Sequence, residues 1–232
     1  MIFRALRAQL TQRGLPPRIA GVRLQSSVAA ATGTTPTQQD VTATYRDVMG
    51  LHSQPVMILT TNGNSDGHEP RGLTLSSVTS LSLKPEPLVC FNLQVPSRTS
   101  QVLHDREVFA LNMLPGTKDS VRACRFFSGA YGNNVNPFAA ELDIFTQSKE
   151  FHNLPVILDS MAILYCQKHQ VMRVHDHEIW VAKVVGVDNR SLVHGADEAM
   201  LYQKRHFKQV GKEIGEPTKE EVAEDVRRGT CA

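Results

Sequence analysis

The sequence predicts a mainly β fold with flanking helices, arranged as a small barrel. Many short apolar or alternating segments follow one another along the chain, while few segments have a helical pattern. That combination is typical of a small β-barrel. The chain has 232 residues, of which 41% are hydrophobic, so its length fits one domain with a substantial core.

Residues 1–39 differ in composition from the rest of the chain. They contain five arginines and neither lysine nor an acidic residue. Apolar Ile2, Phe3, Leu6 and Leu10 can share one face of a short helix, with arginines on the other face. This pattern is typical of a mitochondrial transit peptide and predicts a location in the mitochondrial matrix, while a disordered tail is the alternative interpretation.

The charge of the remaining chain argues against some classes of partner. The formal charge of +2 includes those five arginines, so the chain from Asp40 onward carries −3. A nearly neutral chain without a stripe of basic and aromatic residues does not indicate nucleic-acid binding. No run of about 18 apolar residues predicts a membrane span.

The first elements of the domain have clear local patterns. A short helix is expected over residues 39–49, and the apolar residues 55–61 form the first strong strand. Residues 62–67 are rich in Gly and Asn, which predicts a turn. The strand that begins at Gly72 is therefore expected to pair antiparallel with the first strand.

Residues 72–83 alternate over their whole length and predict one strand with a hydroxyl-rich face. Thr74, Ser76 and Ser82 fall on that face, whereas Ser77 falls on the other, so a turn or bulge at residues 76–77 would be needed to bring them to one ligand. A hydroxyl-rich face is also typical of solvated antiparallel sheets. Two prolines then force a turn before a buried strand over residues 88–93.

A helix is expected over residues 99–106, and Ser97, Arg98 and Thr99 lie where it starts. Free backbone N–H groups and the helix dipole favour anions at such a start. Together with the hydroxyl-rich strand, this start suits a polar, flat and phosphorylated ligand.

The later elements continue the β pattern. Thr117 is expected to cap a second helix, and a loop is expected over residues 129–154. A capping box at residues 218–221 predicts a helix in the charged tail, residues 211–232. Strands are expected over residues 108–114, 155–166 and 201–207, with two more over residues 171–187 that meet near Asp176.

Several common catalytic classes lack their motifs. There is no G-x-G-x-x-G, P-loop, G-x-S-x-G or H-E-x-x-H sequence. The four cysteines form no C-x-x-C pair, and Cys90 and Cys166 are expected to be buried in strands. His175 and His177 would share one face of a strand, but two histidines without a third ligand are weak evidence for a metal.

The segment G-x-T-x-S-S-x-x-S-x-S-L-x-P-x-P-L-V at residues 72–89, followed by S-x-T at residues 97–99, resembles the flavin reductase-like family of FMN-binding split barrels. Asp176, His177 and Ile179 match the family's G-D-H-x-I motif, in which His175 replaces the glycine. The resemblance extends from about Val48 to Phe207 and includes the segment that ends the barrel.

The resemblance implies a Greek-key split β-barrel with a six-stranded core over residues 40–210, which binds FMN, or FAD in its place, and forms a homodimer with the flavin near the subunit interface. NADH or NADPH would pass hydride to the flavin N5, with His177 as the catalytic-site residue near the nicotinamide or the flavin ring. The implied flavin-binding residues are Arg71, Thr74, Ser76, Ser77, Ser82, Asn92, Ser97, Arg98, Thr99 and Tyr202.

Two other functions stay open at this point. The barrel could serve as an FMN-binding assembly or binding factor that has lost turnover. It could also be an FMN-dependent enzyme that reduces something other than free flavin.

Overall fold

The computed structural model describes residues 37–63, 69–132, 135–139, 142–191, 198–212, 215, 218 and 220. Most of the predicted transit peptide and almost all of the predicted C-terminal helix lie outside these residues, as does part of the turn predicted over residues 62–67. The chain divides into two units, residues 1–41 and 42–232, and the sheets belong to the second. None of the described helices is long and apolar enough to cross a membrane.

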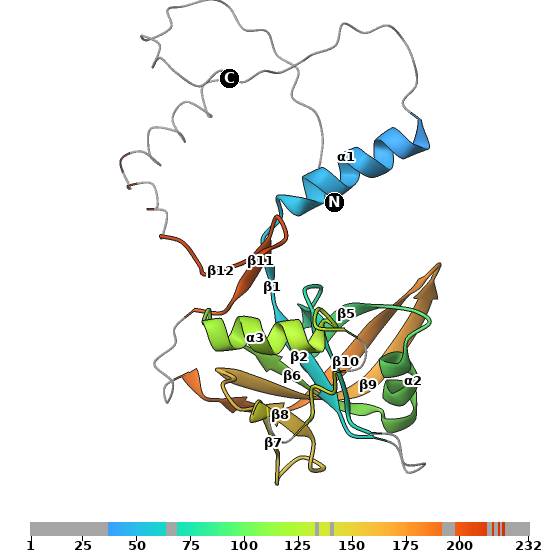
Figure 1. The fold of residues 1–232 in the computed structure, drawn as a ribbon, viewed down its shortest axis with the longest axis vertical. Helices are drawn as coiled ribbons and strands as arrows, with labels where there is room; N and C mark the ends of the chain where they lie inside the picture. Colours follow the sequence, from blue (N-terminus) through green and yellow to red (C-terminus); the bar gives the residue numbers. More distant parts are fainter. Residues whose placement is uncertain are drawn as a thin grey trace, which may run out of the picture. The chain divides into compact units, whose positions relative to one another are not determined.

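An antiparallel sheet of seven strands forms the body of the second unit (Figure 1). Its strand order is β3-β2-β6-β9-β10-β5-β4, and each neighbouring pair runs antiparallel. The strands are β2 (Met57–Thr61), β3 (Arg71–Leu75), β4 (Thr79–Ser82), β5 (Leu88–Gln94), β6 (Val108–Met113), β9 (Ala162–Val174) and β10 (His177–Asn189).

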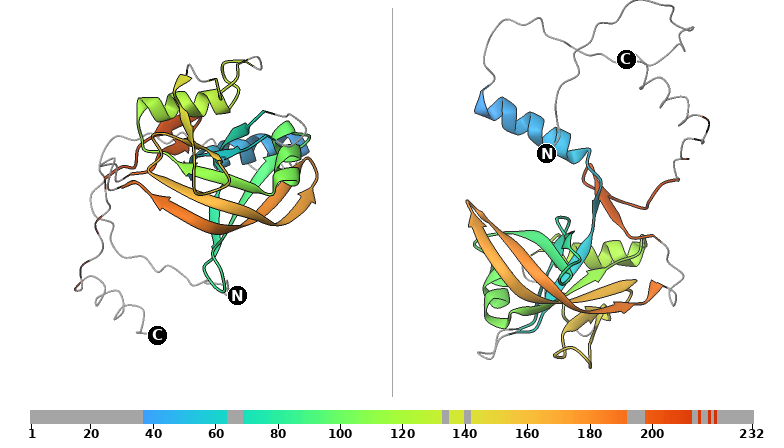
Figure 2. Two further views of the ribbon diagram at one scale, coloured as in Figure 1. Left: turned by 90° about the horizontal axis from the view of Figure 1, so that it is seen from below. Right: turned by 180° about the vertical axis from the view of Figure 1, so that it is seen from behind.

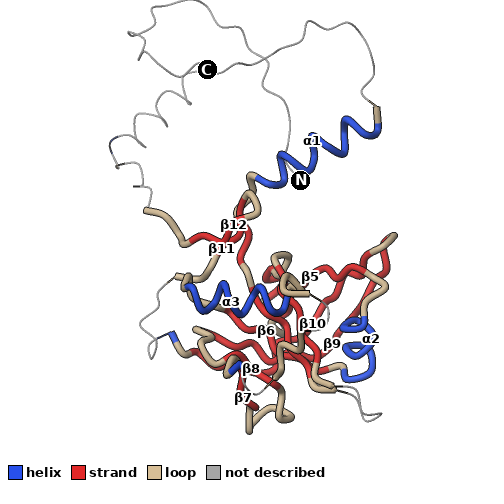
Figure 3. Tube along the Cα trace, in the orientation of Figure 1, coloured by secondary structure: helices blue, strands red, loops and turns tan. Residues whose placement is uncertain are grey.

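Two smaller sheets and three helices complete the described part of the chain (Figure 3). One small sheet holds β1 (Gln54–Pro55), β11 (Leu201–Gln203) and β12 (His206–Lys208), and the other holds β7 (Phe145–Gln147) and β8 (Pro155–Ile157). The helices are α1 (Gln38–Gly50), α2 (Arg98–Arg106) and α3 (Lys118–Phe127).

The single strand predicted over residues 72–83 is wrong, because the structure divides it into β3 and β4. The main sheet therefore has seven strands, where a six-stranded core was expected. The chain bends at Ser76, so β3 pairs with β2 at one edge of the sheet and β4 pairs with β5 at the other. This bend lies where a turn or bulge would be needed to bring the hydroxyls of residues 74–77 to one ligand. No backbone pairing joins β3 to β4 in the described part of the chain, so closure of the barrel is not detected.

Other predicted strands are also divided. A turn separates β8 from β9, where one strand was expected over residues 155–166. Residues 201–207 form part of a hairpin, because Lys204 and Arg205 adopt positive φ angles of 49° and 64° between β11 and β12. His175 has a φ of 53° and lies in the turn before β10, so it does not share a strand face with His177.

Local signals predicted the helices and the hairpins well. The predicted helices correspond to α1, α2 and α3, with Ser97 and Thr117 as the N-caps of α2 and α3. The antiparallel pairing of β2 with β3 is confirmed, and so are the two strands β9 and β10 that meet near Asp176. The turn after the two prolines joins β4 to β5, which also pair antiparallel.

The main sheet is strongly curved (Figure 2). The main core cluster takes almost all of its buried side chains from α2 and from six of the seven strands of this sheet. Trp180 is fully buried there, and its ring stacks on Phe91 with centroids 6.1 Å apart. Leu103 of α2 joins the same cluster, which holds this helix against the sheet. Cys166 is buried as expected, whereas Cys90 is only half-buried. Burial raises the pKa of the Cys166 thiol to about 12, so this thiol stays protonated at neutral pH.

Candidate functional site

The start of α2 combines a serine cap, an arginine and backbone N–H groups that lack partners within the helix. Ser97 has extended backbone angles, and its Oγ accepts a hydrogen bond from the Ser100 N–H at 3.3 Å. Arg98 and Thr99 open the helix, and its first turn contains no acidic residue. The remaining backbone N–H groups of the first turn have no partner within the helix, and they lie at the positive end of its dipole.

A cavity of about 440 Å³ lies at this helix start. Arg71 at the beginning of β3 lines it together with Arg98 and Thr99. The end of α3, two glycines of the following segment and residues 135–138 supply further walls. Glu69 is the only acidic residue among the described lining residues. Three of the predicted flavin-binding residues, from two elements far apart in the sequence, therefore meet at one cavity.

Arg71 lines the cavity and carries a buried polar atom that is unpaired among the described residues. Its Nε atom is buried and has no hydrogen-bond partner in the part of the chain that the structure describes. Buried polar atoms in native proteins are nearly always paired, because an unpaired one costs about 1–3 kcal/mol. An anion in the cavity would supply an acceptor near this guanidinium, and the Arg98 side chain would add a second positive charge.

Gly72 and Thr74 hold the wall of the cavity in place. A Cβ atom on Gly72 would lie 2.7 Å from the Phe127 ring and 2.8 Å from the Leu59 carbonyl oxygen, so only glycine permits this approach of β3 to α3. The Thr74 hydroxyl donates to the Cys124 carbonyl of α3 at 2.7 Å. Both motif residues therefore fasten α3 to the sheet.

Seven of the ten predicted flavin-binding residues do not line this cavity in the described structure, and five of them have contacts elsewhere in the fold. Thr74 points its hydroxyl to α3, and the Ser77 Oγ accepts from the Asn92 backbone N–H at 3.0 Å, which connects the bend after β3 to β5. The Ser82 hydroxyl donates to the Lys84 carbonyl at 2.8 Å. Tyr202 lies on β11, with its ring centroid 5.2 Å from that of Phe207.

Ser76 and Ser97 also lie outside the set of lining residues, although each is next to an element that borders the cavity. Ser76 forms the bend at the end of β3, and Ser97 precedes Arg98. The roles proposed for all of these residues toward a ligand stay predictions.

His177 begins β10 beside the turn of the long β9–β10 hairpin. Its Nδ1 lies 3.0 Å from Asp176 Oδ1, and 47% of its side chain is exposed. The hydrogen bond with His177 is the main reason that the pKa of Asp176 lies below its ordinary value. The Asp176 carbonyl accepts from the Val95 N–H at 2.8 Å, which connects the hairpin turn to the segment that leads into α2.

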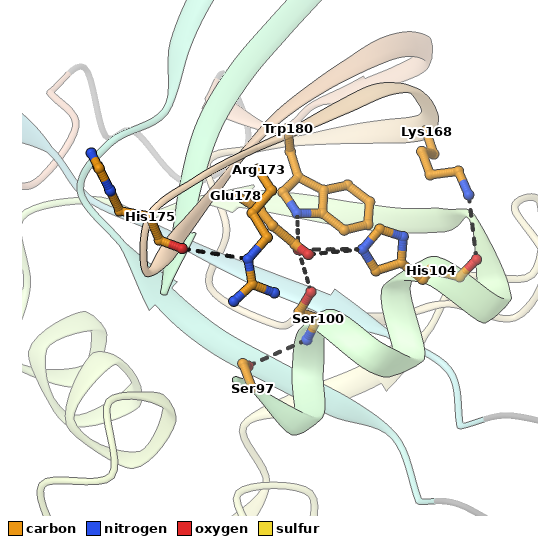
Figure 4. A network of polar contacts seen from close by, with 8 residues as sticks. All are labelled: Ser97, Ser100, His104, Lys168, Arg173, His175, Glu178 and Trp180. Atoms are coloured by element: carbon orange, nitrogen blue, oxygen red, sulfur yellow. Dashed lines mark hydrogen bonds and ion pairs between the residues drawn. The ribbon is translucent and has the colours of Figure 1, made fainter. Parts of the chain in front are cut away.

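A buried polar network next to α2 was missed by the sequence analysis (Figure 4). The Glu178 carboxylate accepts from Ser100 Oγ at 2.5 Å and from Trp180 Nε1 at 3.1 Å, and it lies 3.2 Å from His104 Nε2. Burial raises the pKa of Glu178, but these hydrogen bonds outweigh it, and the pKa lies below its ordinary value.

One signal in the sequence could have found Glu178. Positions 178, 180 and 182 of β10 alternate with half-buried positions and point into the core. A carboxylate at an inward position of a strand needs hydrogen-bond donors from another element, because an unpaired buried charge is very costly. The identity of those donors depends on how α2 packs, and the strand pattern carries no information about that.

A larger cavity, of about 510 Å³, lies on another face of α3. Lys118, Arg122 and Arg125 line it, but none of the predicted site residues does. We therefore assign the candidate site to the smaller cavity, where the predicted residues and the unpaired Arg71 Nε coincide.

Comparison with known proteins decides the family. Residues 49–211 match the Flavin reductase like domain, a match that spans more than half of the chain. The chain belongs to the flavin reductase-like family. Among its curated relatives is the NADH-dependent flavin reductase StyB of Pseudomonas fluorescens, which is 27% identical over 140 residues, 60% of this chain and 74% of the relative. An NADH-dependent FAD reductase of Streptomyces globisporus is 27% identical over 172 residues, 74% of this chain and 87% of the relative.

Solved structures of flavin reductases share the fold. The Streptomyces globisporus NADH:FAD oxidoreductase SgcE6, in complex with NAD and FAD fragments, has a TM-score of 0.63 at 26% identity, over 78% of this chain and 100% of that one. A flavin reductase domain protein from Arthrobacter has a TM-score of 0.63 at 21% identity, over 76% of this chain and 99% of that one. At that identity the second match concerns the fold alone.

Proposed function

We propose that this protein is an NAD(P)H-dependent flavin reductase that takes FMN, or FAD, in the cavity at the start of α2. The observation that carries the proposal is the cavity of a flavin reductase-like domain in which Arg71, Arg98 and Thr99 converge. Flavin, when bound, supplies the redox chemistry by accepting hydride from the reduced nicotinamide at N5.

The residues of the chain would bind and orient the substrates. Arg71, Arg98 and the first turn of α2 would hold the phosphate by charge-assisted hydrogen bonds. The bend at Ser76 and Ser77 lies beyond the other end of β3, and its hydroxyls would meet the ring or the ribityl chain. His177 would hydrogen-bond the nicotinamide and orient it, with no proton transfer required, because hydride moves directly between stacked rings.

The curated relatives give information on which nicotinamide and which flavin this protein uses in the proposed reaction. The two curated relatives are an NADH-dependent flavin reductase and an NADH-dependent FAD reductase. Their names favour NADH as the reductant and make FAD an equal candidate with FMN. We keep both flavins in the proposal.

The homodimer and the mitochondrial location belong to the same proposal. The resemblance to the family supports the dimer, and the acid-free arginine series before Asp40 supports import. A fluorescent reporter that carries residues 1–39 should enter the mitochondrial matrix, and a version with the five arginines changed to glutamine should stay in the cytosol. Cytosolic retention of the first reporter would contradict the predicted location.

Flavin-dependent oxidation of NADH and NADPH by the purified full-length chain tests the proposed function. Binding of FMN and FAD is measured first, by quenching of flavin fluorescence. We expect saturable binding of at least one flavin and oxidation of at least one nicotinamide that requires it. Binding without oxidation would favour the alternative, a flavin-binding factor without turnover, and absence of binding would contradict both functions.

A further inference from the structure

We propose that Glu178 is a positioning residue for flavin binding, which fixes the first turn of α2 so that Arg98 and Thr99 face the cavity. This inference rests on the proposed function and deepens it, because it assigns a role to a residue that does not line the cavity. Its basis is the network that connects β10 to α2 (Figure 4).

Ser100 is the link between the carboxylate and the helix start. Its backbone N–H donates to the Ser97 Oγ at 3.3 Å and closes the cap of α2. Its own Oγ donates to Glu178 Oε2 at 2.5 Å. The residue that completes the cap is thus bound directly to the strand, and Arg98 and Thr99 lie between Ser97 and Ser100 in the sequence.

His104 provides a second contact between α2 and the Glu178 carboxylate. It follows Ser100 by four positions, so both side chains project from the same face of α2. His104 Nε2 lies 3.2 Å and 3.3 Å from the two carboxylate oxygens, and its ring centroid is 4.7 Å from that of Trp180. Two contacts one helical turn apart prevent rotation of α2 about its axis, which would otherwise carry Arg98 and Thr99 away from the cavity.

The carboxylate itself is held in place from the strand side. Glu178 has 9% of its surface exposed, and the Trp180 indole N–H donates to Oε2 at 3.1 Å. An ionised carboxylate only accepts hydrogen bonds, so Ser100, His104 and Trp180 all act as donors here. The β10 strand is in turn paired with β5 and β9 on both sides, which makes it a rigid support.

The sign of the effect separates positioning from simple electrostatics. A negative charge beside an anion-binding helix start disfavours the anion, so an electrostatic role predicts tighter flavin binding when the charge is removed. A positioning role predicts weaker binding. Ser100→Ala removes the link and leaves the charge, and Glu178→Gln removes the charge and retains the shape.

The test compares flavin dissociation constants of full-length variants by fluorescence titration. We expect Ser100→Ala and Glu178→Gln each to weaken flavin binding by about tenfold. In turnover, the KM for flavin should rise while the KM for the nicotinamide stays within about twofold. Ser100→Thr retains a hydroxyl and should restore most of the affinity. Glu107→Gln is the matched control, because Glu107 pairs with Lys168 at the other end of the same helix and does not line the cavity.

Three results decide the matter. Weaker binding in both variants, with rescue by Ser100→Thr and no change in Glu107→Gln, supports the positioning role. A wild type that binds flavin, with unchanged or tighter binding in Ser100→Ala, contradicts this inference alone. A wild type that binds no flavin contradicts the proposed function and this inference with it. If Glu178→Gln fails to fold, the flavin affinity of Ser100→Ala still tests the positioning role.

Discussion

The hydroxyl of Ser100 donates to the carboxylate of Glu178 at 2.5 Å, across a sequence separation of 78 residues. This bond joins the helix that begins at the candidate site to the strand that begins with His177. The buried Glu178 carboxylate is therefore one of the connections between the two sides of the proposed site, one for the flavin phosphate and one for the nicotinamide.

Arg98→Ala should weaken flavin binding with little change in stability. Arg98 is exposed at the start of α2, and no ion pair with it is found among the described residues. Loss of a charge-assisted hydrogen bond to phosphate predicts about 1.5–3 kcal/mol weaker binding, measured by fluorescence titration. Arg122→Ala, in the larger cavity, serves as the control and should bind flavin normally. Unchanged affinity in Arg98→Ala would remove Arg98 from the phosphate site.

Thr74→Val tests whether Thr74 serves the ligand or the fold. Its hydroxyl donates to the Cys124 carbonyl, so the isosteric change should lower the free energy of unfolding by about 1 kcal/mol. Chemical denaturation measures that loss, and flavin affinity should stay within about twofold because the contact joins β3 to α3. The opposite result, normal stability with weak flavin binding, would assign the hydroxyl to the ligand.

The stability of the protein should depend on pH through Glu178. Its pKa in the folded protein lies below the ordinary value of 4.5, so the unfolded state binds the proton more tightly. The contribution of Glu178 is therefore fully present above pH 4.5 and is lost as the pH falls through the folded pKa. Denaturation curves of wild type and Glu178→Gln should converge in that acid range. A constant difference between them down to acid pH would show that this carboxylate does not contribute by ionisation.

His177→Ala should leave flavin bound while slowing its reduction by about tenfold to a hundredfold, or raising the KM for the nicotinamide. The side chain is half-exposed and its one described contact is with Asp176, so the fold should tolerate the loss. His169→Ala, an exposed histidine on β9, is a suitable control. Reduction at the wild-type rate in His177→Ala would make this histidine a structural residue paired with Asp176.

Much of the fold was predicted from local sequence patterns, in which all the residues that matter lie close together in the chain. Ser97 and Thr117 cap their helices because the cap depends on the next three residues alone. The break at Ser76 left only a weak trace in the sequence: the adjacent polar residues Ser76 and Ser77 interrupt the apolar alternation, which resumes at Leu81. The chain bends there because β3 and β4 pair with different partners, β2 and β5, and alternation does not specify partners.

Part of the candidate site was predicted from the sequence, and the part that depends on helix packing was not. Arg71, Arg98 and Thr99 were predicted as flavin-binding residues from the resemblance to the family, and the fold brings all three to one cavity. The network of Glu178 was not predicted, since it arises only when α2 packs against β10. Ser82 and Tyr202 carry motif matches, yet their described contacts are with Lys84 and with Phe207.

Anaerobic reduction of the flavin-loaded wild-type protein tests the central claim most directly. The full-length chain is mixed with FMN or FAD and then with NADH or NADPH in a stopped-flow instrument, and the visible flavin absorbance is followed. We predict that at least one nicotinamide bleaches the bound flavin, and that it does so much faster than it reduces the same flavin in free solution. Flavin that binds to the protein but is bleached by neither nicotinamide, or no faster than in free solution, would contradict the assignment as a flavin reductase.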